Sequence, residues 1–232
     1  AVGIGSVTDS LSAMKELVFD RNELSLQAFV EMIDADYQGH ETVRQRCVNK
    51  SHKYGNDDDY ADALMTQTFN MLFESVDGRP NTKGGAYHLQ LLPTTCHVYF
   101  GEVCLASADG RGGGQPVSEG ISPVQGADRC GPTAVLRSAS KMDHVKTGGT
   151  LLNMKFTPSL LQGEGGIESL QRLVRSYFKL DGHHVQFNVV TADTLRTAKA
   201  DPASHRDLIV RVAGYSDYFC DLSEALQDEI IR

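Results

Sequence analysis

Two stretches of the chain carry residue types that could bind an ion. Three consecutive aspartates, Asp57, Asp58 and Asp59, could hold a cation. A pattern of helical spacing follows them directly, and negative charge is favourable in the first turn of a helix, so we interpret them as helix-capping residues. Three glycines after Arg111 could cradle a phosphate, but the Walker pattern is absent and a flexible loop is favoured. A loop as long as residues 107–126 commonly lines an active site.

Thiol and imidazole groups are a second source of chemistry. The five cysteines are Cys47, Cys96, Cys104, Cys130 and Cys220, with irregular spacings and no C-x-x-C. This usage is typical of reduced thiols in a cytoplasm, where we place the protein. Cys96-His97 and His183-His184 could together bind a metal, but the spacing of zinc sites is absent, so we predict no metal site.

The third stretch, residues 211–219, organises the end of the chain. An apolar run ends at Val212, Gly214 follows, and two tyrosines and a phenylalanine come next, at Tyr215, Tyr218 and Phe219. The pattern predicts a strand, a glycine turn, an aromatic cluster and then a helix over 222–230. From the residues alone, Gly214 supplies the positive φ of a turn.

The elements that must position these residues follow from periodicity and turn signals. Helices are expected over 9–19, capped by Thr8 or Asp9, and over 25–33, 41–49 and 61–73. Strands are expected over 86–92, ended by Pro93, and over 98–101. Helices and strands then alternate: a helix from Pro132, a strand over 150–156, a helix to 178, a strand over 185–190, a helix from 191 or 193 to 198 and a strand over 208–212. Strands separated by helices indicate parallel βα units, so the fold class is α/β.

Composition excludes some classes of partner. The chain has 232 residues, 22 basic and 30 acidic, with a net charge of −8. An acidic balance argues against nucleic acid as the main partner. No apolar run approaches the roughly 20 residues of a membrane span. The first residues lack the charged and apolar regions of a signal peptide, so we expect no secretory signal.

The amino-acid sequences of several segments resemble those of one family. Val212-Ala213-Gly214-Tyr215-Ser216 resembles the radical-bearing loop of the glycyl radical enzymes, the pyruvate formate-lyase-like family. Residues 53–58, 92–95, 119–123, 131–135, 149–153 and 186–189 look like family segments in family order, so the resemblance covers the whole chain. It implies the second half of a ten-stranded α/β barrel with surrounding helices. The expected parts are a helical region (1–85), a barrel half with βα units (86–207) and the radical loop with a C-terminal helix (208–232).

The resemblance also implies which residues act. It assigns a backbone radical to Gly214, with Arg211, Val212, Ala213, Tyr215 and Ser216 as the rest of the radical loop. A radical at Cα must flatten, and glycine has no Cβ to crowd a flat centre. In the family this radical generates a thiyl radical on a cysteine in a Cys-x-Glu setting. None of the five cysteines here has that setting, so we expect a fragment that lacks the reactive cysteine and begins at Ala1 within a longer protein.

The activity implied is that of a lyase or dehydratase that breaks a C–O, C–N or C–C bond of a small metabolite. Residues 140–144 and 181–186 look closer to the dehydratase branches than to pyruvate formate-lyase, a formate acetyltransferase. Hydroxyproline dehydratase-like enzymes come first, then glycerol, choline and isethionate lyases. The partners implied are an activase using S-adenosylmethionine and an iron–sulfur cluster, the missing N-terminal half and, in the full enzyme, a second copy. No cofactor is expected to bind directly.

Two open questions remain at the level of sequence. A protein carrying only a radical domain can complement an oxygen-damaged enzyme, so a non-catalytic subunit is the alternative. In the strand expected over 86–92, either the apolar or the polar set of side chains could face the barrel interior. We favour Tyr87 and Leu89 as pocket residues, because a radical intermediate needs a dry pocket with few polar groups.

Overall fold

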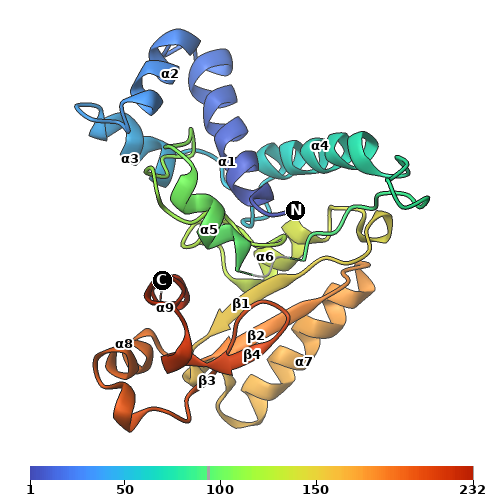
Figure 1. Ribbon diagram of the computed structural model, residues 1–232, viewed down its shortest axis with the longest axis vertical. Helices are drawn as coiled ribbons and strands as arrows, with labels where there is room; N and C mark the ends of the chain where they lie inside the picture. The colour runs from blue at the N-terminus through green and yellow to red at the C-terminus, as the bar shows by residue number, and fades with distance from the viewer. Residues whose placement is uncertain (93–94, 232) are drawn as a thin grey trace.

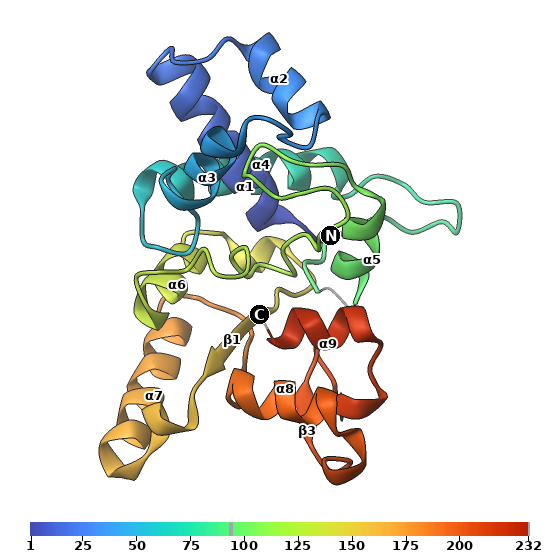
Figure 2. The same cartoon turned by 90° about the vertical axis from the view of Figure 1, so that its left-hand side faces the viewer.

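The computed structural model describes residues 1–92 and 95–231. The helices are α1 (Ile4–Met14), α2 (Leu26–Asp34), α3 (Glu41–Asn49), α4 (Asp59–Val76), α5 (Cys96–Val103), α6 (Pro132–Ala139), α7 (Gly163–Lys179), α8 (Ala192–Ala200) and α9 (Glu224–Ile231). A π-helical segment, η1 (Lys15–Asp20), continues α1, and short 3-10 turns are η2 (His144–Lys146), η3 (Pro158–Leu161), η4 (Pro202–Ser204) and η5 (Phe219–Asp221). Helices α1 to α4 gather at one end of the molecule, and the strands lie at the other with α7 to α9 (Figures 1 and 2).

The strands form two pairs. Strands β1 (Leu152–Phe156) and β2 (Val185–Val189) are parallel, with Asn153 opposite Gln186, and α7 connects them. Strands β3 (Ile209–Arg211) and β4 (Ser216–Tyr218) form an antiparallel hairpin that lies beside β2. The parallel βα unit predicted from the sequence is therefore confirmed. The described residues show two-stranded sheets and no continuous five-stranded half of a barrel.

Three apolar clusters hold these layers together. The largest packs α4, α6 and α7 against β1, around Tyr54, Phe69, Leu152 and Tyr177. A second joins the β3–β4 hairpin to α5, α8 and α9, with Phe219 fully buried in it. The third lies among α1, η1, α2 and α3. The hairpin is thus held by burial of its apolar side chains against α5, α8 and α9, and such burial is the dominant stabilising term in folding.

Several helix starts follow the capping signals. Ser25 accepts a hydrogen bond from the Ala28 amide at 3.1 Å at the start of α2, and Thr191 accepts one from Thr194 at 3.0 Å at the start of α8. Asp58 accepts from the Tyr60 amide at 3.0 Å, which confirms capping of α4 by the aspartate run. The first helix starts earlier than the sequence pattern predicts, because α1 begins at Ile4. Thr8, expected as its cap, is buried inside the helix.

Two predicted strands are wrong. Residues 86–92, all described, form only isolated bridges at Ala86 and at Leu91, and Pro93, expected to end the strand, lies outside the described residues. Residues 98–101 belong to helix α5, not to an extended segment. The buried positions of α5, at 97, 98 and 101, have helical spacing. A Cβ at Gly101 would come within 2.3 Å of the Gln115 carbonyl oxygen, so this helix packs directly against the 107–126 loop.

No helix within residues 1–92 and 95–231 is both long enough and apolar enough to cross a membrane.

Candidate functional site

The glycine turn expected near the C-terminus is the connection of the β3–β4 hairpin. The Val212 amide donates to the Tyr215 carbonyl oxygen at 2.8 Å, which closes the turn over Ala213 and Gly214. Gly214 has a φ of +81°, in the left-handed region where a side chain is strained. Apart from Gly214 itself and its two chain neighbours, no described residue has an atom within 4 Å of the position that a Cβ on Gly214 would take. Glycine is therefore required here by backbone conformation and not by lack of space.

Both polar backbone groups of Gly214 are engaged by side chains. Its amide donates to Oε1 of Gln186 at 3.2 Å, and its carbonyl oxygen accepts from Nη2 of Arg211 at 3.0 Å. Arg211 Nε also donates to the same Gln186 oxygen at 2.9 Å. Gln186 is only 7% exposed, so it holds the turn from inside the molecule. The three residues close a ring of hydrogen bonds around the glycine.

Further amides on the two parallel strands support the same turn. Asn188, two residues after Gln186 on β2, bonds the backbone of Arg211. Asn153, opposite Gln186 on β1, hydrogen-bonds Gln186 and lies 3.4 Å from the Val212 carbonyl oxygen. Sequence reasoning gave these amides no role. The available signal was the placement of two amides at alternate positions, 186 and 188, in an otherwise apolar strand, which puts both on one face.

The remaining residues of the radical loop differ in exposure. Val212 and Ala213 are buried, whereas Gly214, Tyr215 and Ser216 are exposed, and Ser216 Oγ accepts from Arg211 Nη1 at 3.3 Å. The aromatic cluster expected after the glycine is only partly buried within this chain. Phe219 is fully buried, but Tyr215 and Tyr218 are 40% and 46% exposed. Residues 216–218 also form strand β4, which the sequence pattern did not indicate.

A cavity of about 310 Å³ lies against the hairpin. Arg211 and Val212 line it, together with Glu119 and Glu229, and both glutamates are almost fully buried. Burial raises the pKa of Glu119 to about 7, an effect that hydrogen bonding by Asn153 opposes and the nearby Glu229 reinforces. Since Glu119 belongs to the 107–126 loop, part of that loop does line a cavity beside the candidate site.

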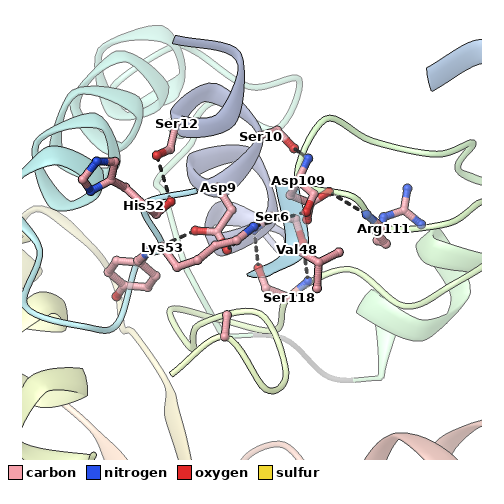
Figure 3. A network of polar contacts seen from close by, with 12 residues as sticks. Ser6, Asp9, Ser10, Ser12, Val48, His52, Lys53, Asp109, Arg111 and Ser118 are labelled. Atoms are coloured by element: carbon pink, nitrogen blue, oxygen red, sulfur yellow. Dashed lines mark hydrogen bonds and ion pairs between the residues drawn. The ribbon is translucent and has the colours of Figure 1, made fainter. Parts of the chain in front are cut away.

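The glycine-rich part of the same loop is engaged in internal contacts instead. Arg111 is 8% exposed and donates to the carbonyl oxygens of Gly112 at 3.1 Å and Gln115 at 2.6 Å. Its amide and the Ser107 hydroxyl both bond the Asp109 carboxylate. The guanidinium thus stabilises the loop from within. Figure 3 shows the contact between Asp109 and Arg111 and the polar network around it.

Helix α1 contributes a buried carboxyl group to that network. Asp9 is fully buried, 3.6 Å from the Lys53 ammonium, and accepts a hydrogen bond from the Tyr54 amide at 2.9 Å (Figure 3). Burial raises the pKa of Asp9 to about 7, although Lys53 opposes the rise. Asp9 was expected as a helix cap, and this packed position inside α1 replaces that expectation. Its contacts join α1 to the segment before α4.

The other candidate residues lie apart from the hairpin. Tyr87 is 52% exposed and Leu89 is buried in the large apolar cluster, and both fall outside the described lining of the cavity. The aspartate run forms ion pairs with Lys141, at 3.1 Å from Asp57 and 2.8 Å from Asp59. In the described part of the chain, no group of three or more histidine, cysteine or acidic side chains is placed to hold a metal ion.

Comparison with known proteins places this geometry in context. The family model described as "Glycine radical" matches residues 117–220, and "Pyruvate formate lyase-like" matches residues 1–101. Trans-4-hydroxy-L-proline dehydratase of Clostridioides difficile is 54% identical over 230 residues, covering 99% of this chain and 29% of that protein. Isethionate sulfite-lyase of Desulfovibrio desulfuricans (strain ATCC 27774 / DSM 6949 / MB) is 42% identical, covering 99% and 28%.

Solved structures show the same likeness. Hydroxyproline dehydratase from Clostridioides difficile, with trans-4-hydroxy-L-proline bound, has a TM-score of 0.96 at 54% identity over 99% of this chain and 29% of that one. The B12-independent glycerol dehydratase from Clostridium butyricum has a TM-score of 0.95 at 41% identity, with the same coverage. This chain spans less than a third of the length of these relatives. On these matches, the chain belongs to the glycyl radical enzymes of the pyruvate formate-lyase-like family.

Proposed function

We propose that this chain is the C-terminal part of a glycyl radical lyase or dehydratase and that Gly214 stores the radical. The observation that carries the proposal is the hairpin turn, in which Gly214 takes a positive φ and both of its polar backbone groups are held by side chains. The "Glycine radical" match over 117–220 includes this turn, which supports the same assignment.

The radical forms when the Cα–H bond of Gly214 breaks homolytically. The hydrogen atom, with one electron, passes to an alkyl radical that an activase derives from S-adenosylmethionine by means of its iron–sulfur cluster. The other electron stays at Cα of Gly214, which becomes planar. In turnover, Gly214 recovers a hydrogen atom from a cysteine thiol outside this chain, and the thiyl radical left behind attacks the substrate.

For the substrate, we favour a hydroxyproline-like small metabolite, whose C–O bond is broken in a dehydration. The support is the 54% identity to trans-4-hydroxy-L-proline dehydratase, against 42% to isethionate sulfite-lyase. We place β1 and β2 within the second half of a ten-stranded barrel, completed by an N-terminal half, in an enzyme that pairs with a second copy. Tyr87 and Leu89 are proposed to face the substrate once the barrel is complete.

The alternative, a subunit that only complements a damaged enzyme, is less well supported. Such a subunit needs little more than the radical domain. Residues 1–101 match the "Pyruvate formate lyase-like" model, and the likeness to complete lyases extends over 99% of the chain. These observations favour a catalytic parent enzyme.

The test is anaerobic activation of the complete enzyme followed by electron paramagnetic resonance. We expect a doublet from one α-proton, which collapses when glycine deuterated at Cα is incorporated. Gly214→Ala should abolish the doublet. Gly84→Ala is the matched control, because Gly84 also has a φ of +81° and, its chain neighbours apart, no described residue within 4 Å of a Cβ, so the backbone strain is alike. A doublet that persists in Gly214→Ala would remove Gly214 from the role.

A further inference from the structure

The surroundings of Gly214 point to a role for two side chains beyond holding the turn. Gln186 accepts from the amide on one side of the glycine Cα, and Arg211 donates to the carbonyl on the other side, at 3.2 and 3.0 Å. These are the two groups bonded directly to the atom that would carry the radical. The inference rests on the proposed function, because it concerns the stability of that radical.

A radical at a glycine Cα is shared between an electron-donating nitrogen and an electron-accepting carbonyl. A hydrogen bond from the amide to an oxygen makes the nitrogen a better donor. A hydrogen bond from a cation to the carbonyl oxygen makes that group a better acceptor, and bonds to charged donors are the stronger kind. Both effects act in the same direction, drawing unpaired spin from Cα into the two peptide groups.

The geometry keeps both contacts in place together. Arg211 Nε donates to the same Gln186 oxygen at 2.9 Å, so each side chain orients the other. Gln186 is nearly fully buried and is also bonded to Asn153 across the parallel strands. The contacts are therefore fixed before any radical forms, which is the condition for electrostatic stabilisation without reorganisation.

We propose that Gln186 and Arg211 stabilise the Gly214 radical electronically, by polarising the amide and the carbonyl that flank its Cα. They are positioning residues for the radical store and take no part in bond cleavage. The prediction is that removal of either contact localises spin on Cα. The α-proton splitting then widens, and the radical decays faster under anoxia.

The experiment uses the complete, activated enzyme and compares the doublet of the wild type with those of Gln186→Met and Arg211→Met. Each replacement keeps an unbranched side chain but removes the polar contact to Gly214. Gln227→Met is the matched control, since Gln227 is as buried as Gln186, at 7% exposed, and donates to the Phe219 carbonyl oxygen at 2.9 Å instead of bonding Gly214. We expect wider doublets and shorter lifetimes in both methionine variants, with an unchanged splitting in the control.

Two conservative variants decide the matter if the methionine variants carry no radical. Gln186→Glu keeps an oxygen acceptor with more negative charge and should narrow the doublet. Arg211→Lys keeps the positive charge and should retain the radical. Splittings identical to the wild type in every variant that carries a radical would overturn the inference, as would loss of the radical from all four, which would mean that the residues only hold the hairpin. Absence of a doublet in the wild type itself would instead reject the proposed function.

Discussion

The side-chain amide of Asn188 forms two hydrogen bonds with the backbone of Arg211. Its Nδ2 donates to the Arg211 carbonyl oxygen at 2.6 Å, and its Oδ1 accepts from the Arg211 amide at 2.7 Å. Asn188 thus hydrogen-bonds both backbone groups of Arg211, at the end of β3, as the backbone of a neighbouring strand would. Because Arg211 also contacts Gly214, this pair connects the parallel sheet to the glycine turn.

Asn188→Ala is expected to loosen the hairpin. The change leaves two part-buried backbone groups without their partner, at a cost of about 1–3 kcal/mol. Hydrogen exchange of the amides in β3 and β4 should become faster, about tenfold for each 1.4 kcal/mol of lost local stability. Asn70→Ala is the control, because the Asn70 side chain accepts one exposed hydrogen bond, from Nζ of Lys146 at 3.0 Å. Equal exchange rates in the two variants would contradict the role of Asn188.

Air should cut the activated protein at the hairpin. Dioxygen adds to a backbone Cα radical, and the chain then breaks at that residue, so exposure of the activated enzyme should release a C-terminal peptide that begins near Gly214. Mass spectrometry identifies the cut, and enzyme that was never activated provides the control. An intact chain after a radical has been detected would exclude Gly214 as its site.

Tyr87→Phe is expected to lower turnover in the complete enzyme and to leave the yield of the Gly214 radical unchanged. The phenol is 52% exposed within this chain, so it remains available to a surface outside the chain. The control is Tyr99→Phe, which removes another exposed hydroxyl from α5. Unchanged turnover would reject the substrate contact, and a lost radical would show that Tyr87 is structural.

The buried Asp9 should make the protein less stable as the pH rises. Its pKa is about 7 when folded, against an ordinary 3.8, so between these values the folded protein keeps a proton that the unfolded chain has lost. The contribution of protonated Asp9 to the free energy of unfolding is fully present below pH 3.8 and is lost as the pH rises through 7. The difference of about three between the folded and the ordinary pKa of Asp9 corresponds to about 4 kcal/mol of unfolding free energy.

Asp9→Asn checks this expectation, since it mimics the protonated carboxyl and keeps the oxygen that accepts from the Tyr54 amide. Urea midpoints of wild type and variant, measured between pH 4 and 8, should diverge, with the smaller decline in the variant. Asp207→Asn, a change at an exposed aspartate, should follow the wild type. Parallel curves for all three proteins would reject burial of a protonated Asp9.

The sequence by itself determined the local elements and the identity of the key turn. Helices start at Ser25 and Thr191 as expected, and the helix from Pro132 and the strands around 152–156 and 185–189 lie where their patterns placed them. The residues around Gly214 indicated the family. These features depend on backbone preferences and hydrophobic periodicity over a few neighbouring residues, which can be read without knowing the fold.

Only the tertiary structure decided which side chains surround the glycine. Gln186 lies 28 positions before Gly214, and its place beneath the turn follows from the parallel pairing of β1 and β2 and the seating of the hairpin beside them. Residues 98–101 have strand-like composition but form part of α5, because Val98 packs in the apolar cluster under the hairpin and Gly101 lets the helix approach the 107–126 loop. Such contacts are set by packing between distant segments, which overrides local propensity.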